Sequence, residues 1–437
     1  MSESHRVTRR GFLKTTAGAG LGLAAFPYFV PSPALGKTGA VAPSERIVMG
    51  AIGVGSMGTG DMKGFLRRDE VRLAAVCDVD KRHRDRAKRM VDEKYGNSDC
   101  AAYLDFRELI GRGDLDAVMI ALPDHWHGII SVAAARAGLD IHAQKPLART
   151  IHEGRAICNA VKKYGIVWQT GSQQRSGRKF RRACELVRNG RIGKVHRVEV
   201  GLPDGHAIGD QPLLPVPDEL DWDFWLGPAP WRPYMDFGRG DCHWQWRWLM
   251  DYSGGQLTDW AGHHIDIAQW GLGLERTGPV EIEGRGVYPQ QGLYDVPVAY
   301  EFTCKYANGI TMVVANDSRQ PKGRGAVWYG DEGWIQVNRG KFDAEPRSVL
   351  DSVIGPDEIH LYRSDDHKGN FLDCVRTGRQ TVAPAEIGHR SISVGLLGEI
   401  AMLTEQKLKW DPDKEVFTNS DEANRLLSRP MRSPWHL

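Results

Sequence analysis

Residues 47–58 read IVMGAIGVGSMG, an apolar run of strand length that ends in the pattern Gly-x-Gly-x-x-Gly. A stretch typical of a helix follows directly after it. Glycine at positions Gly53, Gly55 and Gly58 permits a tight turn and lets a pyrophosphate approach backbone N–H groups at a helix N-terminus. Because the pattern stands between a strand and a helix, it predicts that the chain binds a dinucleotide.

An acidic residue follows at the spacing that this kind of site requires. A second apolar strand is expected over residues 71–76, and Asp78 lies 20 residues after Gly58. A carboxylate there accepts hydrogen bonds from the adenosine ribose hydroxyls and repels a 2′-phosphate, which favours NAD. The basic run Lys81–Arg84 follows closely, so NADP is not excluded, although the simpler interpretation of that run is a solvated helix face.

Strand and helix patterns continue to alternate down to about residue 170. This alternation predicts an α/β fold with a Rossmann-type, doubly wound parallel sheet over residues 46–170. Ligands bind beyond the carboxyl ends of such strands, so residues 124–127 and 144–146 should face the cofactor. Further strands are expected over residues 117–121, 139–143 and 166–169, with a helix over residues 129–137.

Lys145 stands at the end of one of these strands and precedes a proline, which restricts its backbone. A lysine inside a cleft can hydrogen-bond a substrate hydroxyl and share in proton transfer. The alternative interpretation is a surface lysine in a turn.

A second chemical motif is predicted within Ser253–Trp270, SGGQLTDWAGHHIDIAQW. Read as a helix, it places Asp259, His263 and Asp266 on one face, and the opposite face is apolar. A carboxylate one turn away can orient an imidazole ring and leave its other nitrogen free as a base. The alternative is a buried helix in which the two side chains only satisfy each other's hydrogen bonds.

Together these motifs resemble the Gfo/Idh/MocA oxidoreductase family over residues 45–437. The resemblance implies that Lys145 is the active-site lysine and that Asp259 and His263 are the family's aspartate and histidine. The chain departs from the family pattern at Gln144, where a glutamate beside the nicotinamide ribose is usual. The resemblance rests on the segments 53–58, 122–127, 144–148 and 259–266.

From about Val195 the sequence is rich in strand patterns separated by glycine turns. The resemblance implies that these strands form an open, largely antiparallel sheet in an α+β region over residues 171–437. In the family the face of this sheet often serves subunit contacts, so a homo-oligomer, dimer or tetramer, is expected.

The segment 202–252 is rich in tryptophan, and aromatic faces suit sugar rings while Arg and His suit hydroxyls or carboxylates. Trp222, Trp225 and Trp231 are expected to pin this segment to the core, whereas Trp244–Trp248 can line a carbohydrate site. No metal is expected, because no spacing among the histidines completes a zinc site.

Three sets of site residues follow from these motifs. The predicted catalytic residues are Lys145, Asp259 and His263. The predicted cofactor-binding residues are Gly53, Gly55, Ser56, Met57, Gly58, Asp78, Leu122, Pro123, His127, Gln144 and Lys145. The predicted substrate-binding residues are Gln173, Arg175, His206, His243, Arg247, Trp260 and His264.

The charge balance excludes some partners. With 57 basic and 55 acidic residues the formal net charge is +2, which predicts neither nucleic-acid nor anionic-membrane binding. The seven cysteines contain no CxxC pattern, and no disulfide framework is expected. Paired arginines and a weakly apolar run in residues 1–36 are typical of a twin-arginine signal, followed by a linker over residues 37–45. The mature chain is therefore expected to be periplasmic or otherwise exported, without a membrane span.

Export bears on the chemistry, because free NAD is not expected outside the cytoplasm. The cofactor should therefore be tightly held and regenerated in place. One hypothesis is an oxidoreductase that removes hydride from a hydroxyl-bearing carbon of a sugar or sugar derivative. A second is a redox-neutral, NAD-dependent glycoside hydrolase that oxidises, eliminates and reduces. A third, a non-catalytic periplasmic sugar-binding protein, fits poorly with the joint presence of Lys145, Asp259 and His263.

Overall fold

The computed structural model describes residues 42–437. The expected signal segment, residues 1–36, and most of the expected linker, residues 37–45, lie outside the described residues. Pro43–Glu45 form a short 3-10 helix (η3), and Ile47–Leu437 form one compact unit. Within the described residues, no helix is both long enough and apolar enough to cross a membrane.

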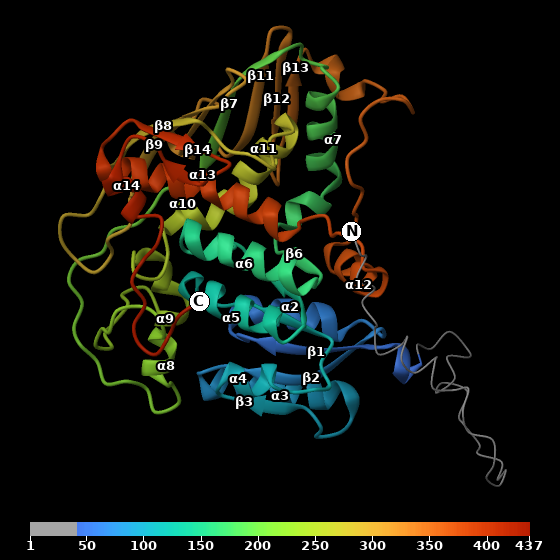
Figure 1. Ribbon diagram of the computed structural model, residues 1–437, viewed down its shortest axis with the longest axis vertical. Coiled ribbons are helices and arrows are strands. Elements are labelled where there is room, and N and C mark those ends of the chain that lie inside the picture. Colours follow the sequence, from blue (N-terminus) through green and yellow to red (C-terminus); the bar gives the residue numbers. More distant parts are fainter. Residues whose placement is uncertain (1–41) are drawn as a thin grey trace, which may run out of the picture. The chain divides into compact units, whose positions relative to one another are not determined.

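The first part of the described chain forms a six-stranded sheet (Figure 1). Its spatial order is β3-β2-β1-β4-β5-β6, and all neighbouring strands are parallel. This confirms the predicted Rossmann-type sheet. β3 escapes sequence-based prediction because it is only three residues long. The strands are β1 (Ile47–Ile52), β2 (Val71–Cys77), β3 (Ala101–Tyr103), β4 (Ala117–Ile120), β5 (Asp140–Ala143) and β6 (Trp168–Thr170).

Helices connect these strands, and one of them begins earlier than predicted. α5 starts at Asp124 instead of residue 129, because Pro123 at its N-cap has φ −59° and so prepares the helical turn. Residues 124–127 are therefore a buried first turn of a helix. The connecting helices are α2 (Ser56–Leu66), α3 (Lys81–Tyr95), α4 (Phe106–Ile110), α5 (Asp124–Arg136) and α6 (Ile151–Tyr164).

The second part of the described chain forms a nine-stranded mixed sheet in the order β13-β12-β11-β7-β10-β9-β8-β14-β15. β7 and β10 are parallel and the other neighbouring pairs are antiparallel, which confirms the open, largely antiparallel sheet. The strands are β7 (Val195–Leu202), β8 (Glu281–Val287), β9 (Ala299–Lys305), β10 (Thr311–Asn316), β11 (Gly325–Gly330), β12 (Gly333–Val337), β13 (Phe342–Glu345), β14 (Leu408–Asp411) and β15 (Val416–Phe417).

One face of this sheet is covered by helices (Figure 1). In β9 the alternate residues Tyr300, Phe302 and Cys304 are buried, as the two-residue period of a strand requires. Trp328 of β11 donates a 3.1 Å hydrogen bond to the Ala268 carbonyl and so docks α11. The seven cysteines, which all lie in the described part of the chain, are buried and unpaired. The remaining helices are α7 (Arg178–Arg188), α8 (Trp222–Leu226), α9 (Cys242–Gln245), α10 (Gly255–Trp260), α11 (Asp266–Leu272), α12 (His367–Thr377), α13 (Ala385–Thr404) and α14 (Asp421–Arg425).

The helix predicted within Ser253–Trp270 is divided by a π-helical segment, η6 (Ala261–Ile265), between α10 and α11. The Asp259 carboxylate accepts a hydrogen bond from Lys145, and His263 Nδ1 has no hydrogen-bond partner among the described residues. The predicted pairing of Asp259 with His263 is therefore not formed.

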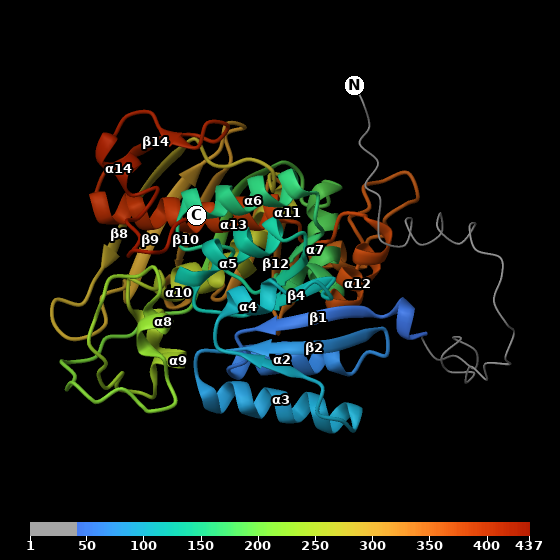
Figure 2. The same ribbon diagram turned by 60° about the horizontal axis from the view of Figure 1, so that its bottom comes forward.

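The long connection between β7 and α10 crosses to the six-stranded sheet, where α8 and α9 lie beside it (Figures 1 and 2). Main-chain hydrogen bonds fix it there: Lys81 N donates to Glu219 O at 2.8 Å, and Asp221 N donates to Val79 O at 3.2 Å. We call residues 219–247 the roof segment. Two of its tryptophans are buried as expected, but a third, Trp231, is 65% exposed, so the prediction that it pins the segment is wrong.

Candidate active site

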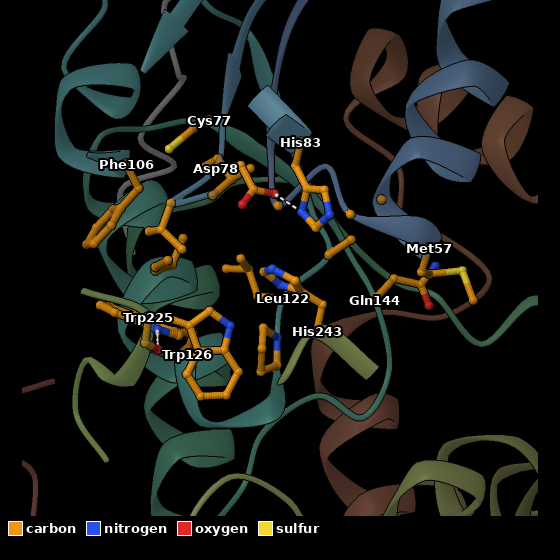
Figure 3. A pocket seen from close by; sticks show the side chains of 18 of the residues that line it. Met57, Cys77, Asp78, His83, Phe106, Leu122, Trp126, Gln144, Trp225 and His243 are labelled. Atoms are coloured by element: carbon orange, nitrogen blue, oxygen red, sulfur yellow. Dashed lines mark hydrogen bonds and ion pairs between the residues drawn. The ribbon is translucent and has the colours of Figure 1, made fainter. Parts of the chain in front are cut away.

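A cavity open to solvent, about 980 Å³ with the open solvent space included, lies at the carboxyl ends of the parallel strands (Figure 3). Gly53 has φ 78°, and a Cβ there would overlap the Ala121 carbonyl oxygen. A Cβ at Gly58 would likewise overlap the Gly53 carbonyl oxygen, whereas a Cβ at Gly55 would have its nearest neighbour 3.6 Å away on His83. The turn is therefore closely packed on one side and open on the other, as a pyrophosphate cradle requires.

The side chains around this cavity include the cofactor-binding residues predicted from sequence, with one exception. His127 is fully buried, with Nδ1 2.6 Å from the Pro146 carbonyl oxygen and Nε2 3.0 Å from that of Leu122. Burial lowers its pKa to about 4. His127 thus supports two strand ends from behind and does not reach the cavity. The predicted residues that line the cavity are Gly53, Gly55, Ser56, Met57, Gly58, Asp78, Leu122, Pro123, Gln144 and Lys145.

Asp78 is held in place by two main-chain donors at the end of β2. Its Oδ2 accepts a 2.9 Å hydrogen bond from Val54 N, and its Oδ1 accepts one of 2.9 Å from Asp80 N. His83 faces the same carboxylate, with Nδ1 3.6 Å from Oδ2 (Figure 3). These bonds orient the carboxylate beside the glycine turn, where the ribose hydroxyls of a dinucleotide would lie.

The roof segment closes this end of the cavity. His243 Nε2 lies 3.0 Å from Oδ2 of the fully buried Asp80, and its ring centroid lies 4.4 Å from that of His83. Trp246 also lines the cavity, whereas Trp244 is largely exposed. His243 therefore lies at the nucleotide end, which differs from its predicted place at the substrate. The prediction missed this because Asp80 is distant in sequence.

Lys145 and Asp259 form an ion pair beyond Gln144. Lys145 Nζ donates to Asp259 Oδ1 at 2.8 Å and to the Asp259 carbonyl at 3.1 Å. Arg247, which lies between the rings of two tryptophans, brings its Nε to 3.5 Å from the same Oδ1. Burial alone would raise the pKa of Asp259, but Lys145 and Arg247 outweigh burial and lower it. Asp259 is therefore a carboxylate that orients Lys145, and it does not orient His263 as predicted.

His263 lies on the π segment with only 4% of its surface exposed. Burial first, and then the charges of Lys145 and Arg339, place its pKa well below the ordinary value, so the ring is neutral. Its Nδ1 has no hydrogen-bond partner among the described residues. Ser172 Oγ donates to the Gly262 carbonyl at 2.9 Å and supports the segment from the other side. A neutral imidazole with a free nitrogen can accept a proton.

Family models match both parts of the chain. The oxidoreductase-family model of the NAD-binding Rossmann fold matches residues 47–172, and the model of the family's C-terminal alpha/beta domain matches residues 205–437. The chain belongs to the Gfo/Idh/MocA oxidoreductase family. It is an enzyme of that family, and its cofactor is NAD.

Relatives in this family carry two kinds of name. The chain is 30% identical over 382 residues to the myo-inositol 2-dehydrogenase of Thermotoga maritima. The alignment covers 83% of this chain and 98% of that protein. It is also 30% identical over 379 residues to a glycosyl hydrolase family 109 protein of Shewanella baltica. That alignment covers 79% of this chain and 75% of the Shewanella protein. The fold is similar to that of the aldose-aldose oxidoreductase of Caulobacter crescentus, with a TM-score of 0.59 and 19% sequence identity. The superposition covers 83% of this chain and 99% of the Caulobacter chain.

Arg175, predicted to contact substrate, is 1% exposed in this Gfo/Idh/MocA protein. Its Nε and Nη2 donate to the two Asp266 carboxylate oxygens at 2.7 and 2.8 Å, and Ser391 Oγ donates to Oδ1 at 2.6 Å. Both charges are thus satisfied inside the protein. The substrate role predicted for Arg175 is wrong, because its guanidinium is enclosed in a structural ion pair.

The other predicted substrate residues are divided between two places. Trp260 and His264 lie beside His263: Trp260 stacks on His264 with centroids 5.3 Å apart and meets His263 edge-on at 5.4 Å. His206 packs against Trp248 at 4.6 Å, next to the roof segment. Gln173 opens the 3-10 helix η4 (Gln173–Ser176), which adjoins η6 through Ser172.

Three potential metal ligands, Asp80, His83 and His243, come within 4.8 Å of one another. His83 and His243 line the nucleotide end of the cavity, and the fully buried Asp80 lies behind them. Arg82 already donates to both oxygens of Asp80, at 3.2 and 2.8 Å. We therefore assign this cluster to closure of the NAD site. Neither Asp80 nor His83 was predicted as a site residue; their place just after β2 is the signal that could have revealed them.

Proposed function

We propose that the protein oxidises a hydroxyl group of a sugar or sugar derivative while NAD stays bound. The observation that carries this proposal is the position of Lys145: it lines the NAD cavity and at the same time binds Asp259 on α10, directly before the π segment that bears His263. The relatives named as an inositol dehydrogenase and an aldose oxidoreductase support a polyol or sugar as substrate.

His263, Lys145 and Asp259 would have separate roles in this oxidation. Bound NAD supplies the acceptor for the hydride that leaves the hydroxyl-bearing carbon. His263, kept neutral by burial, would take the hydroxyl proton on its imidazole ring. Lys145, directed by Asp259, donates a hydrogen bond to the same oxygen and stabilises the negative charge that develops there. Asp259 acts through Lys145 and is a positioning residue.

Retention of NAD is supported by the roof segment, which lies over the nucleotide end and bonds to Asp80 and Lys81. A held cofactor suits an exported enzyme, and the twin-arginine pattern in residues 1–36 supports export to the periplasm. We also propose a homo-oligomer, because the helices of the described residues that pack on the nine-stranded sheet cover one of its faces (Figure 1).

A second candidate is redox-neutral cleavage of a glycoside: oxidation of one carbon, elimination of the aglycone as an alcohol, addition of water to the resulting double bond, and return of the hydride from the reduced cofactor. The relatives named glycosyl hydrolase family 109 favour it. Lys145 and His263 would serve this cycle without change.

Two measurements test these proposals. Mass spectrometry of the protein as isolated should find about one NAD per chain. The isolated protein is then incubated with aryl glycosides and with free sugars, without added cofactor, beside the Lys145→Ala variant. Release of aglycone supports the glycosidase cycle, and formation of a keto-sugar or lactone supports the oxidoreductase. No conversion of either substrate class would refute both.

A further inference from the structure

Two connections of the nine-stranded sheet bring arginines to the face of Trp260: Arg339 lies in the β12–β13 hairpin, and Arg324 directly precedes β11. The guanidinium carbon of Arg339 lies 4.8 Å from the Trp260 ring centroid, and that of Arg324 lies 5.2 Å from it. The Asn338 amide donates to the Arg324 carbonyl at 2.8 Å, so the two connections are tied together. Trp260 in turn stacks on His264, next to the proposed base. Both arginines remain exposed, so a ligand can reach them.

Arg339 belongs to the active site electrostatically. Three causes lower the pKa of His263: burial is the largest, the charge of Lys145 comes second, and the charge of Arg339 comes third. Gln174 joins the two groups: with its amide oriented by its neighbours, the nitrogen lies 3.0 Å from the His263 carbonyl and the oxygen lies 3.2 Å from Arg339 Nε.

The charges around Trp260 are unequal. Arg324 pairs with Asp317 at 2.6 Å, whereas no carboxylate of the described residues lies within 4.0 Å of Arg339. Partial burial lowers the pKa of Arg339, and of the two nearby charges Asp259 raises it while Arg324 lowers it. On the other side, Lys145 and Arg247 share the single carboxylate of Asp259. The buried Asp124 also interacts with Lys145 and Arg247, so the cation that no carboxylate of the described residues pairs with is Arg339.

Because Arg339 is exposed and has no carboxylate of the described residues within 4.0 Å, its guanidinium is free to pair with an anion from solution. Structural stacking on Trp260 alone does not explain two arginines on one ring, because the second guanidinium repels the first. Arginine presents a planar fork that binds carboxylates in a bidentate manner.

We propose that Arg339 and Arg324 form an anion subsite beside Trp260, so that the preferred substrate is a sugar carrying a carboxylate, such as a uronic acid. This inference rests on the proposed function and specifies its substrate class. The carboxylate would pair with Arg339, while the hydroxyl to be oxidised lies between Lys145 and His263.

Binding to the NAD-loaded protein tests the subsite. Calorimetric titrations would compare glucuronate and galacturonate with glucose and galactose, and sulfate would serve as a simple competing anion. We expect at least one uronate to bind roughly tenfold or more tightly than its neutral counterpart. Arg339→Gln should remove that difference, and Arg339→Lys should restore part of it. Arg376→Gln, at an exposed position of α12, is the matched control and should behave like the parent.

Two outcomes would overturn the subsite: neutral sugars that bind as tightly as the acids, or a preference for acids that survives Arg339→Gln. Competition by sulfate that Arg339→Gln abolishes would support it. Because these readouts are equilibrium binding, they separate the two proposals. Acid binding that depends on Arg339 without any turnover would leave the subsite standing and refute the proposed oxidation.

Discussion

Replacing His243 with alanine should speed the release of NAD. His243 Nε2 lies 3.0 Å from Oδ2 of Asp80, which is fully buried. Burial opposes the charge of Asp80, but hydrogen bonds from His243 and Arg82 outweigh burial and lower its pKa. A hydrogen bond to a charged group contributes about 1.5–3 kcal/mol. If the roof segment must lift before NAD leaves, losing this bond should accelerate release roughly 10- to 150-fold.

The assay is exchange of bound NAD against an excess of isotopically labelled NAD, followed by mass spectrometry of the protein-bound fraction. His196→Ala is the control, since His196 is exposed on β7. Thermal unfolding of both variants shows whether the fold is retained. An exchange rate within a factor of about two of the parent, or an equal acceleration in the control, would refute the reasoning that the roof segment retains the cofactor.

Other substitutions give sharp expectations. Lys145→Ala and His263→Gln should each lower turnover by about 10²–10⁴-fold, with the NAD content by mass spectrometry unchanged; parental rates in both would contradict the assignment. Burial raises the pKa of Asp124 to about 7, so the folded state holds this proton more tightly than the unfolded chain, and stability is lost as pH rises from about 4 towards 7. Asp124→Asn should therefore unfold at a higher temperature than the parent at pH 8 but not at pH 4; the opposite pH trend in calorimetry would refute this. Arg175→Met leaves Asp266 buried without its partner and should cost about 3–5 kcal/mol in urea unfolding; a loss below about 1 kcal/mol would show that the ion pair contributes little.

Local patterns allowed the first sheet and its glycine turn to be predicted. The fingerprint Gly53–Gly58 works through its own backbone: two positions tolerate no side chain, and the third is open to the cavity. Asp78 could be placed because it follows a strand whose end lies beside that turn. Strand alternation also identified most of the second sheet. What alternation missed were short or glycine-containing strands, such as β3 and β8.

The predicted catalytic group came partly from spacing and partly from family resemblance, and spacing gave the wrong partner for Asp259. Its carboxylate accepts a hydrogen bond from Lys145, and no hydrogen bond joins it to His263 among the described residues. No local rule reveals this, because the partner of Asp259 lies 114 residues away in the chain.

The sequence by itself therefore determined that this protein has a dinucleotide-binding fold, since the glycine turn that identifies the fold depends on neighbouring residues and on backbone freedom. Only the tertiary structure decided which charges meet. It enclosed Arg175 with Asp266, brought His243 over Asp80, and placed Arg339 against Trp260 with no carboxylate of residues 42–437 within 4.0 Å. These outcomes depend on burial and on the distances between side chains of separate elements, and residue spacing along the chain encodes neither.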